Sequence, residues 1–381
     1  MAERIDPNLH RELKTFGAGD LDICYSCGTC TAICPLSDEN SSFPRHVIHM
    51  AQVGLKERLQ KSIEPWMCYY CGDCSDSCPR EANPAETMMA ARRYLTASYD
   101  WTGISKKLYL SGAAEVAAVV LVGVIIGLLF LFLHGPVVTD RVELNTFAPV
   151  KWIELGDLIM AAILSFFLLS NALRMMYWFI GKDKDLHVPL SAYILEAKTM
   201  LVNFFTQKRW RGCSEDHTRW LKHLLLVSGY LTMLTLVLIL LRWFQTDKIY
   251  PIYHPQRLLG YYATIVLLYF TVDFMIGRRK KKERIHEFSH ASDWMFLVLL
   301  FLTALTGIMV NIFRISGLPL ATYIIYVIHL MIAVPMLVVE VPFGKWAHLF
   351  YRPFALYLVA VKDRAKAMEK ARSKKKAVAA A

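Results

Sequence analysis

Six long apolar runs dominate the chain after its first hundred residues. Each run is long enough to cross a hydrocarbon core of about 30 Å, which needs about 20 helical residues. The polar stretches between the runs are short. We therefore predict six transmembrane helices, near residues 109–133, 153–180, 220–244, 257–277, 292–313 and 321–343.

The first hundred residues follow a different pattern. Apolar residues recur at helical spacing over residues 45–59, and a second helix is expected over 85–95. No strand-like alternation stands out. The pattern predicts an all-α chain with a helical, cytoplasmic head over 1–104, a six-helix membrane bundle over 105–350 and a basic cytoplasmic tail over 351–381.

Basic residues are distributed unevenly between the loops. Segments 182–216 and 278–290 contain six Lys and Arg residues each, and 344–381 contains ten. The intervening loops contain two, one and one. Because positive charge is retained on the cytoplasmic side of a membrane, we expect both termini in the cytoplasm, and a multi-pass protein of a bacterial or archaeal cytoplasmic membrane.

Composition supports a membrane protein and narrows the meaning of the charge. Hydrophobic residues make up 55% of the 381 residues, and the mean hydropathy of +0.34 is too high for a soluble domain alone. The net charge of +11 lies mostly in loops between apolar runs, so we expect contact with membrane lipid and no nucleic-acid partner. No signal peptide is expected.

Eight of the nine cysteines form two identical runs. Each run follows C-x2-C-x2-C-x3-C and is followed by proline, the pattern of bacterial ferredoxins in which the fourth cysteine serves the other cluster. We therefore predict two [4Fe–4S] clusters with crossed ligand sets: Cys24, Cys27, Cys30 and Cys78 for the first, and Cys68, Cys71, Cys74 and Cys34 for the second. The ninth cysteine, Cys213, stands alone and has no predicted chemistry.

Zinc is the alternative metal, since it also binds four thiolates. Zinc sites more often pair two C-x2-C units than present four cysteines in one run, so iron–sulfur is the preferred interpretation. The 33 residues between the runs have a helical pattern. Residues 24–35, 43–45 and 68–79 resemble the α-helical ferredoxin domain, and in particular the C subunit of heterodisulfide reductase.

Histidines in the apolar part are candidate axial ligands of haem b, because two imidazoles at one membrane depth can clamp its iron. His223 near the start of the third predicted helix and His348 at the end of the sixth are expected at the same depth. His329 precedes His348 by 19 residues, about 28 Å along a straight helix. One haem therefore cannot use both of them.

Residues 328–330 and 342–348 resemble the haem b subunit of respiratory nitrate reductase and the E subunit of heterodisulfide reductase. This resemblance implies that His329 and His348 are axial ligands, one for each of two haems. It also implies that His223 is the first ligand from the third helix.

The second ligand of that helix falls on Met233 in this chain. Met233 could bind haem through its thioether, but packing in the core is the preferred interpretation. His254 as the ligand instead, a five-coordinate haem, and no second haem are alternatives that stay open. Glu340 and Asp273 are candidates for carrying the proton that quinone chemistry requires. A carboxylate bonded to a neighbouring helix is the structural alternative for both.

The whole chain resembles the membrane subunits of the quinone-interacting membrane-bound oxidoreductase (Qmo) complexes of sulfate reducers, most closely over residues 68–84 and 86–89. This resemblance implies two haems b, menaquinol as the reductant and two soluble flavin and iron–sulfur partner subunits. It also implies delivery of electrons toward adenylylsulfate reductase.

We therefore interpret the chain as an electron-transfer subunit that takes electrons from menaquinol through haem b to the clusters and a docked flavoprotein. Nicotinamide and flavin motifs are not found, so a complete enzyme is not expected. Three alternatives stay open: a complex that runs in the opposite direction and reduces quinone, a membrane redox sensor, and a transporter with a zinc-binding head.

Overall fold

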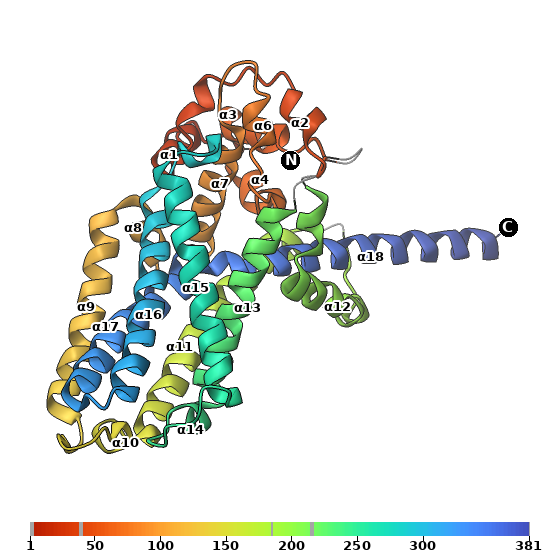
Figure 1. Ribbon diagram of the computed structural model, residues 1–381. Helices are drawn as coiled ribbons and strands as arrows, with labels where there is room; N and C mark the ends of the chain where they lie inside the picture. The colour runs from red at the N-terminus through yellow and green to blue at the C-terminus, as the bar shows by residue number, and fades with distance from the viewer. Residues whose placement is uncertain (1–3, 38–40, 184–185, 214–216, 381) are drawn as a thin grey trace. The chain divides into compact units, whose positions relative to one another are not determined.

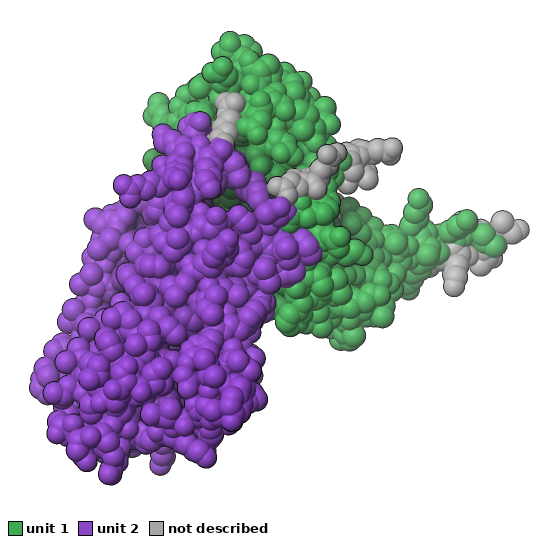
Figure 2. All heavy atoms as spheres, viewed as in Figure 1, with its two compact units in different colours: residues 1–106, 169–217, 347–381 green, residues 107–168, 218–346 purple. Residues whose placement is uncertain are grey.

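The computed structural model describes residues 4–37, 41–183, 186–213 and 217–380. These residues form helices and connecting turns, with no β-strand among them, which confirms the all-α prediction. The chain divides into two compact units, coloured separately in Figure 2. The head unit comprises residues 1–106, 169–217 and 347–381, and the membrane unit comprises 107–168 and 218–346.

Short helices build the first part of the head unit, and the longest is α7 (Pro84–Tyr99). Asn83 caps α7 by accepting the Glu86 N–H over 3.2 Å, and Pro84 supplies a fixed φ at its first position. The predicted helix 85–95 is thus confirmed. The preceding elements are α1 (Leu9–Thr15), η1 (Gly19–Asp22), α2 (Thr29–Ile33), α3 (Arg45–Val53), α4 (Lys56–Lys61), α5 (Glu64–Met67) and α6 (Asp73–Asp76).

The stretch 45–59 is helical, as its spacing predicts, but it is divided into α3 and α4. Gly54 adopts a left-handed φ of 80°, and Leu55 N–H bonds back to the Met50 carbonyl, which ends α3. A Cβ at Gly54 would lie 3.0 Å from the Asp6 carbonyl carbon, so only glycine fits this turn.

The membrane unit contains most of the six helices that are long and apolar enough to cross a membrane. Their bounds agree with the prediction to within a few residues. The six spans are Gly112–Leu133 (α9), Val150–Gly181 (α11, Val150–Met176, with the π-helical turn η2, Tyr177–Gly181), Thr218–Leu238 (α13), Pro255–Arg279 (α15), Ala291–Ile315 (α16) and Pro319–Phe343 (α17).

Two span boundaries differ for local reasons. The first span begins later than expected, because Ser111 caps α9 by accepting the Ala114 N–H over 3.2 Å, which separates it from α8 (Ile104–Leu110). The third span ends at Leu238 instead of 244, and residues 241–244 form the separate turn α14 (Leu241–Phe244). Short elements complete the unit: α10 (Leu144–Phe147), η4 (Arg284–His286) and η5 (Lys345–Ala347).

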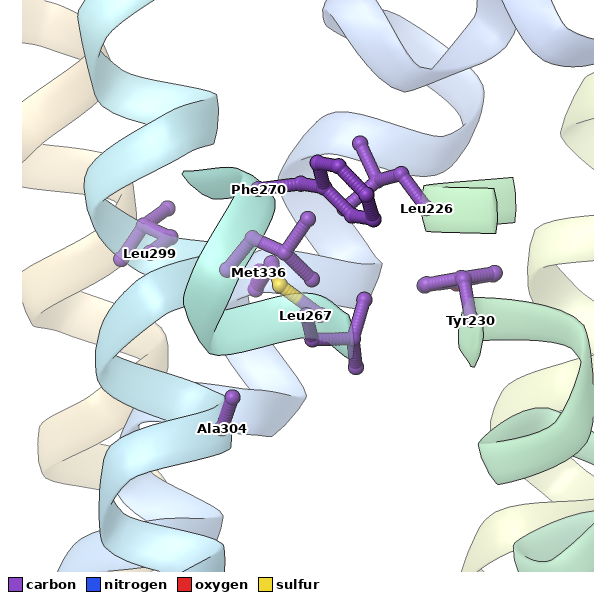
Figure 3. Close-up of a cluster of buried hydrophobic side chains, with 8 residues drawn as sticks. Leu226, Tyr230, Leu267, Phe270, Leu299, Ala304 and Met336 are labelled. Carbon is purple, nitrogen blue, oxygen red and sulfur yellow. The ribbon is translucent and has the colours of Figure 1, made fainter. Parts of the chain in front are cut away.

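Close helix packing in the membrane unit runs from α13 to α15, α16, α17 and α9 in turn (Figure 1). Figure 3 shows the buried cluster at its centre, built from four of these helices: Leu226, Tyr230, Leu267, Phe270, Leu299, Leu300, Ala304 and Met336. Large apolar side chains point outward on α9, where Leu121 is 61% and Phe132 is 77% exposed. Lipid is the environment in which such surfaces are stable.

Two later segments complete the head unit as helices. The segment expected as a basic loop contains α12 (Leu190–Thr206), and the expected tail forms α18 (His348–Ala380). These helices pack together, and the Tyr357 hydroxyl donates to the Tyr193 carbonyl over 3.1 Å. Arg364 of α18 forms an ion pair with Glu196 of α12.

Candidate iron–sulfur and haem sites

The two cysteine runs adopt the same local fold. In each run the first sulfur accepts a backbone N–H from the residue two positions later, over 3.4 Å for Ser26 to Cys24 and 3.3 Å for Tyr70 to Cys68. Ser26 and Tyr70 have left-handed φ values of 55° and 56°. A glycine with positive φ then begins a short helix in each run: Gly28 at 94° and Gly72 at 103°. The repeated geometry turns backbone N–H groups toward sulfur, as an iron–sulfur loop requires.

The first pocket is lined by Cys24, Cys27, Cys30 and Cys78. Three of these thiols come from the first run and one from the second, which is the grouping that crossed ligation needs. The pocket opens at a surface, since Cys27 is exposed and Tyr25 is 70% exposed. The Arg80 guanidinium lies 4.1 Å from the centroid of the Tyr25 ring.

The second pocket is lined by Cys34, Cys68, Cys71 and Cys74, the other crossed set. It is lined by a fifth thiol as well, Cys213, which is only 4% exposed. Cys213 follows η3 (Lys208–Gly212), where Trp210 packs on Tyr69 with ring centroids 5.5 Å apart. Sequence reasoning missed this residue, because nothing in its local spacing indicates a contact with a distant cysteine run.

The thiol chemistry of both pockets suits a cluster that carries positive iron. Burial, together with the neighbouring thiols Cys24 and Cys27, raises the pKa of Cys30 to about 11, and burial raises the pKa of Cys71 to about 12. Iron would hold such buried groups as thiolates. Within the described ranges, no three His, Cys, Asp or Glu side chains converge to hold a single metal ion. The thiols instead surround a shared space, as the corners of a cube require.

Two arginines that the sequence did not indicate lie beside the second pocket, and Arg92 is buried whereas Arg352 is half-buried. Arg92 of α7 and Arg352 of α18 both donate to the Cys68 carbonyl, Arg352 over 3.0 Å. The Arg352 guanidinium also lies 3.9 Å from the centroid of the Tyr69 ring. Burial lowers the pKa of Arg92 to about 9, so it is still a cation at pH 7. The arginines lining the first pocket are exposed: Arg45 and Arg80.

His329 lies in α17 with its ring against α16. Its Nδ1 is 2.9 Å from the Thr306 hydroxyl oxygen, and a Cβ at Gly307 would lie 3.3 Å from its Cε1. A hydrogen bond at Nδ1 orients a histidine ring and leaves Nε2 as the nitrogen for a metal. The residues around His329 therefore fit its predicted role as an axial ligand of haem.

The predicted pair His223 and His348 belongs to different units, so the pairing stays a prediction. His223 lies in the second turn of α13, and His348 begins α18. The straight helix assumed between His329 and His348 is absent. Instead α17 continues through its prolines to Phe343, and the extended Gly344 (φ −106°, ψ −157°) and η5 then separate it from α18.

The remaining candidates have contacts of their own. His254 caps α15 by accepting the backbone N–H two residues later over 3.4 Å. Met233 is half-buried in α13. Asp273 of α15 forms an ion pair with Lys222 of α13 over 2.7 Å. Glu340 of α17 is completely buried. These contacts describe the surroundings of the four residues and leave their predicted roles as predictions.

Known proteins resemble the head. Residues 18–79 match the model of the 4Fe–4S dicluster domain family. The C subunit of the H2:CoB–CoM heterodisulfide,ferredoxin reductase of Methanothermobacter thermautotrophicus is 34% identical over 88 residues, which are 23% of this chain and 48% of that protein. A protein of Archaeoglobus profundus, described as like the C subunit of heterodisulfide reductase, is 34% identical over 104 residues, 26% of this chain and 55% of that protein.

A third relative is the iron–sulfur C subunit of the CoB–CoM heterodisulfide reductase of Methanopyrus kandleri, 35% identical over 69 residues, 18% of this chain and 36% of that protein. The chain spans about half the length of the first two relatives. No solved structure matches it. Residues 18–79 therefore match a 4Fe–4S dicluster domain, and the head is similar to the C subunits of heterodisulfide reductases, in a chain with six helices that are long and apolar enough to cross a membrane.

Proposed function

We propose that the chain links the menaquinone pool, through haem b and two [4Fe–4S] clusters, to soluble flavin and iron–sulfur partner subunits of the same complex. In this proposal its electrons go on toward adenylylsulfate reductase. The observation that carries the proposal is the pair of pockets, each lined by three thiols of one run and one of the other. Pockets that share both runs hold two clusters close together, as an electron relay needs.

The environments of the pockets support an order for the relay. The second pocket is lined by Cys213 as well as by its four predicted ligands, and Arg352 donates to the Cys68 carbonyl beside it. The first pocket opens at a surface with exposed Tyr25 and Arg80. We therefore assign the first cluster to exchange electrons with a docked partner subunit.

Haem b would supply a one-electron carrier within the membrane part. His329 would bind the iron of one haem through Nε2, and the Thr306 hydroxyl would hold the ring in position. His223 and His348 are the proposed ligands of the other haem. Met233 and His254 are the candidates for completing the site at His329.

A second direction of flow is a candidate because the relatives are named as subunits of heterodisulfide reductases. In that direction the clusters would receive electrons from a thiol–disulfide partner and pass them to quinone. The residues would keep their roles, since the same relay conducts both ways. The difference lies in the relative potentials of quinone, haem and clusters.

Anaerobic mixing of the full chain in lipid nanodiscs with menadiol, a naphthohydroquinone, tests the proposal. We expect menadiol to bleach the iron–sulfur absorption of the wild type. His329→Ala should slow the bleaching at least about tenfold, because it removes an electron carrier. The exposed His187 offers a matched control, and His187→Ala should not slow the bleaching. Clusters that dithionite reduces but menadiol does not would contradict quinol oxidation by this chain.

A further inference from the structure

Two carboxyl groups meet inside the membrane unit. Glu115 of α9 is 2% exposed and Glu340 of α17 is fully buried. The helices α9 and α17 pack against each other, and the two carboxyl groups lie close enough to interact directly. Glu115 lies in the first turn of α9, and Glu340 lies three residues before the end of α17 at Phe343. The pair therefore sits about one helical turn inside one end of the bundle.

The contacts of Glu340 require a proton on the pair. Its Oε2 accepts the backbone N–H of Lys345 over 2.8 Å, and a Cβ at Gly344 would collide with this oxygen. Its Oε1 is buried and has no donor within the described part of the chain. A carboxyl–carboxyl hydrogen bond exists only if one of the two groups is protonated. A proton held between Glu115 and Glu340 therefore supplies the missing donor, and it avoids placing two negative charges together away from water.

A charged network lies between this pair and solvent. Asp293, in the first turn of α16, acts electrostatically on Glu115 and forms an ion pair with the Lys345 ammonium group. Arg278, at the end of α15, reaches the other oxygen of Asp293 over 3.7 Å. Side-chain exposure rises from 8% at Asp293 to 32% at Lys345. The network marks the side of the membrane unit that is bounded by the basic loop 278–290.

We propose that Glu115 and Glu340 form a shared-proton site that accepts protons from quinol and releases them to solvent beside Lys345 and Asp293. The inference rests on the proposed function. Oxidation of one hydroquinone breaks two O–H bonds and releases two electrons and two protons. Bound haem b and clusters would take up the electrons. The singly protonated pair takes up one proton at a time and returns to its starting state as that proton leaves.

The test uses the full chain in lipid nanodiscs and two readouts. The first is the infrared band of a protonated, buried carboxyl group, measured without any quinone. The second is the rate at which menadiol reduces the clusters, measured across pH in H2O and in D2O. Glu340→Gln and Glu115→Gln remove one acid each and keep a hydrogen-bonding side chain of similar shape. Asp247→Asn is the control, because Asp247 is exposed and accepts the backbone N–H of Asn145 over 2.9 Å.

The wild type should show the band, and both Gln variants should lose it while Asp247→Asn keeps it. Each Gln variant should reduce its clusters about 100-fold more slowly, with a changed pH profile and solvent isotope effect, in line with the usual contribution of a proton-transfer group. Unchanged rates and pH profiles in both Gln variants would overturn proton transfer. A wild type that has the band but does not react with menadiol would overturn the proposed function and leave the shared proton established. Absence of the band from the wild type would overturn the shared proton itself.

Discussion

Replacing Arg352 by glutamine should lower the reduction potential of the second cluster by about 80 mV. The Arg352 Nη2 lies 3.0 Å from the carbonyl oxygen of Cys68, a predicted ligand of that cluster. The distance from this oxygen to the centre of a cluster bound at the Cys68 sulfur is added to this separation. The positive charge of Arg352 therefore lies about 9 Å from the centre of the cluster. Reduction adds negative charge to the cube, so a nearby cation stabilises the reduced form.

The magnitude follows from Coulomb's law. At about 9 Å and an effective dielectric constant of about 20, the interaction of two unit charges is about 1.8 kcal/mol. A free energy of about 1.36 kcal/mol corresponds to a tenfold change in an equilibrium constant, or about 59 mV for one electron. The expected decrease is therefore about 80 mV. Arg352→Lys retains the positive charge, so the potential of its second cluster should stay close to that of the wild type.

A redox titration at pH 7, monitored by electron paramagnetic resonance, measures both clusters in one sample. Arg80→Gln is the matched control, because Arg80 lines the first pocket but is exposed, where solvent screens its charge. We expect Arg80→Gln to change the potential of the first cluster by no more than about 20 mV. Equal decreases of both clusters in Arg352→Gln, or no decrease of the second, would refute this reasoning.

Three further predictions concern single residues. Cys78→Ser should alter the resonance signal of the first cluster, and Cys34→Ser that of the second, because each thiol lies in the pocket of the other run; a change confined to the cluster of the variant's own run would disprove crossed ligation. Cys213→Ala should leave the iron content unchanged and shift the signal of the second cluster, since its thiol lines that pocket. Loss of about half the iron would instead identify Cys213 as a ligand. Burial lowers the pKa of His286, so the unfolded state, with a pKa near 6.5, binds the proton more readily. Stability contributed by neutral His286 should be complete above about pH 6.5 and decrease below it by at most about 1.4 kcal/mol per pH unit. His286→Gln should flatten this part of the pH profile of thermal unfolding, and an unchanged profile would show that His286 does not contribute.

The membrane spans and the cysteine pockets could be predicted because their signals are local. A helix that crosses lipid needs about 20 apolar residues in succession, so each run indicates its own span. The spacing within each cysteine run, and the proline after it, determine which thiols can share a cube. Both features require no knowledge of contacts between distant segments.

Contacts between distant segments are what the sequence could not supply. α12 was expected as a loop because its segment is rich in basic residues, although helical packing against α18 stabilises it. Cys213 reaches the second pocket through the packing of Trp210 on Tyr69. The buried Glu340 carboxyl leaves no room for a side chain at Gly344, where α17 ends.

The contact between the two buried carboxyl groups also depends on segments that are distant in the sequence. Glu115 is a single acidic residue at the start of an apolar helix, where interaction with the helix dipole or the membrane surface is the ordinary expectation. Its partner Glu340 is contributed by another helix, and only the packing of α9 against α17 brings the two together.

Metal, sulfide and haem analysis of the purified full-length chain tests the central claim most directly. We expect about eight iron atoms and eight sulfides per chain in clusters, together with additional iron in haem b. The visible spectrum should combine broad iron–sulfur absorption with a haem band that is diminished in His329→Ala. A colourless protein that contains zinc, and neither sulfide nor haem, would contradict the account.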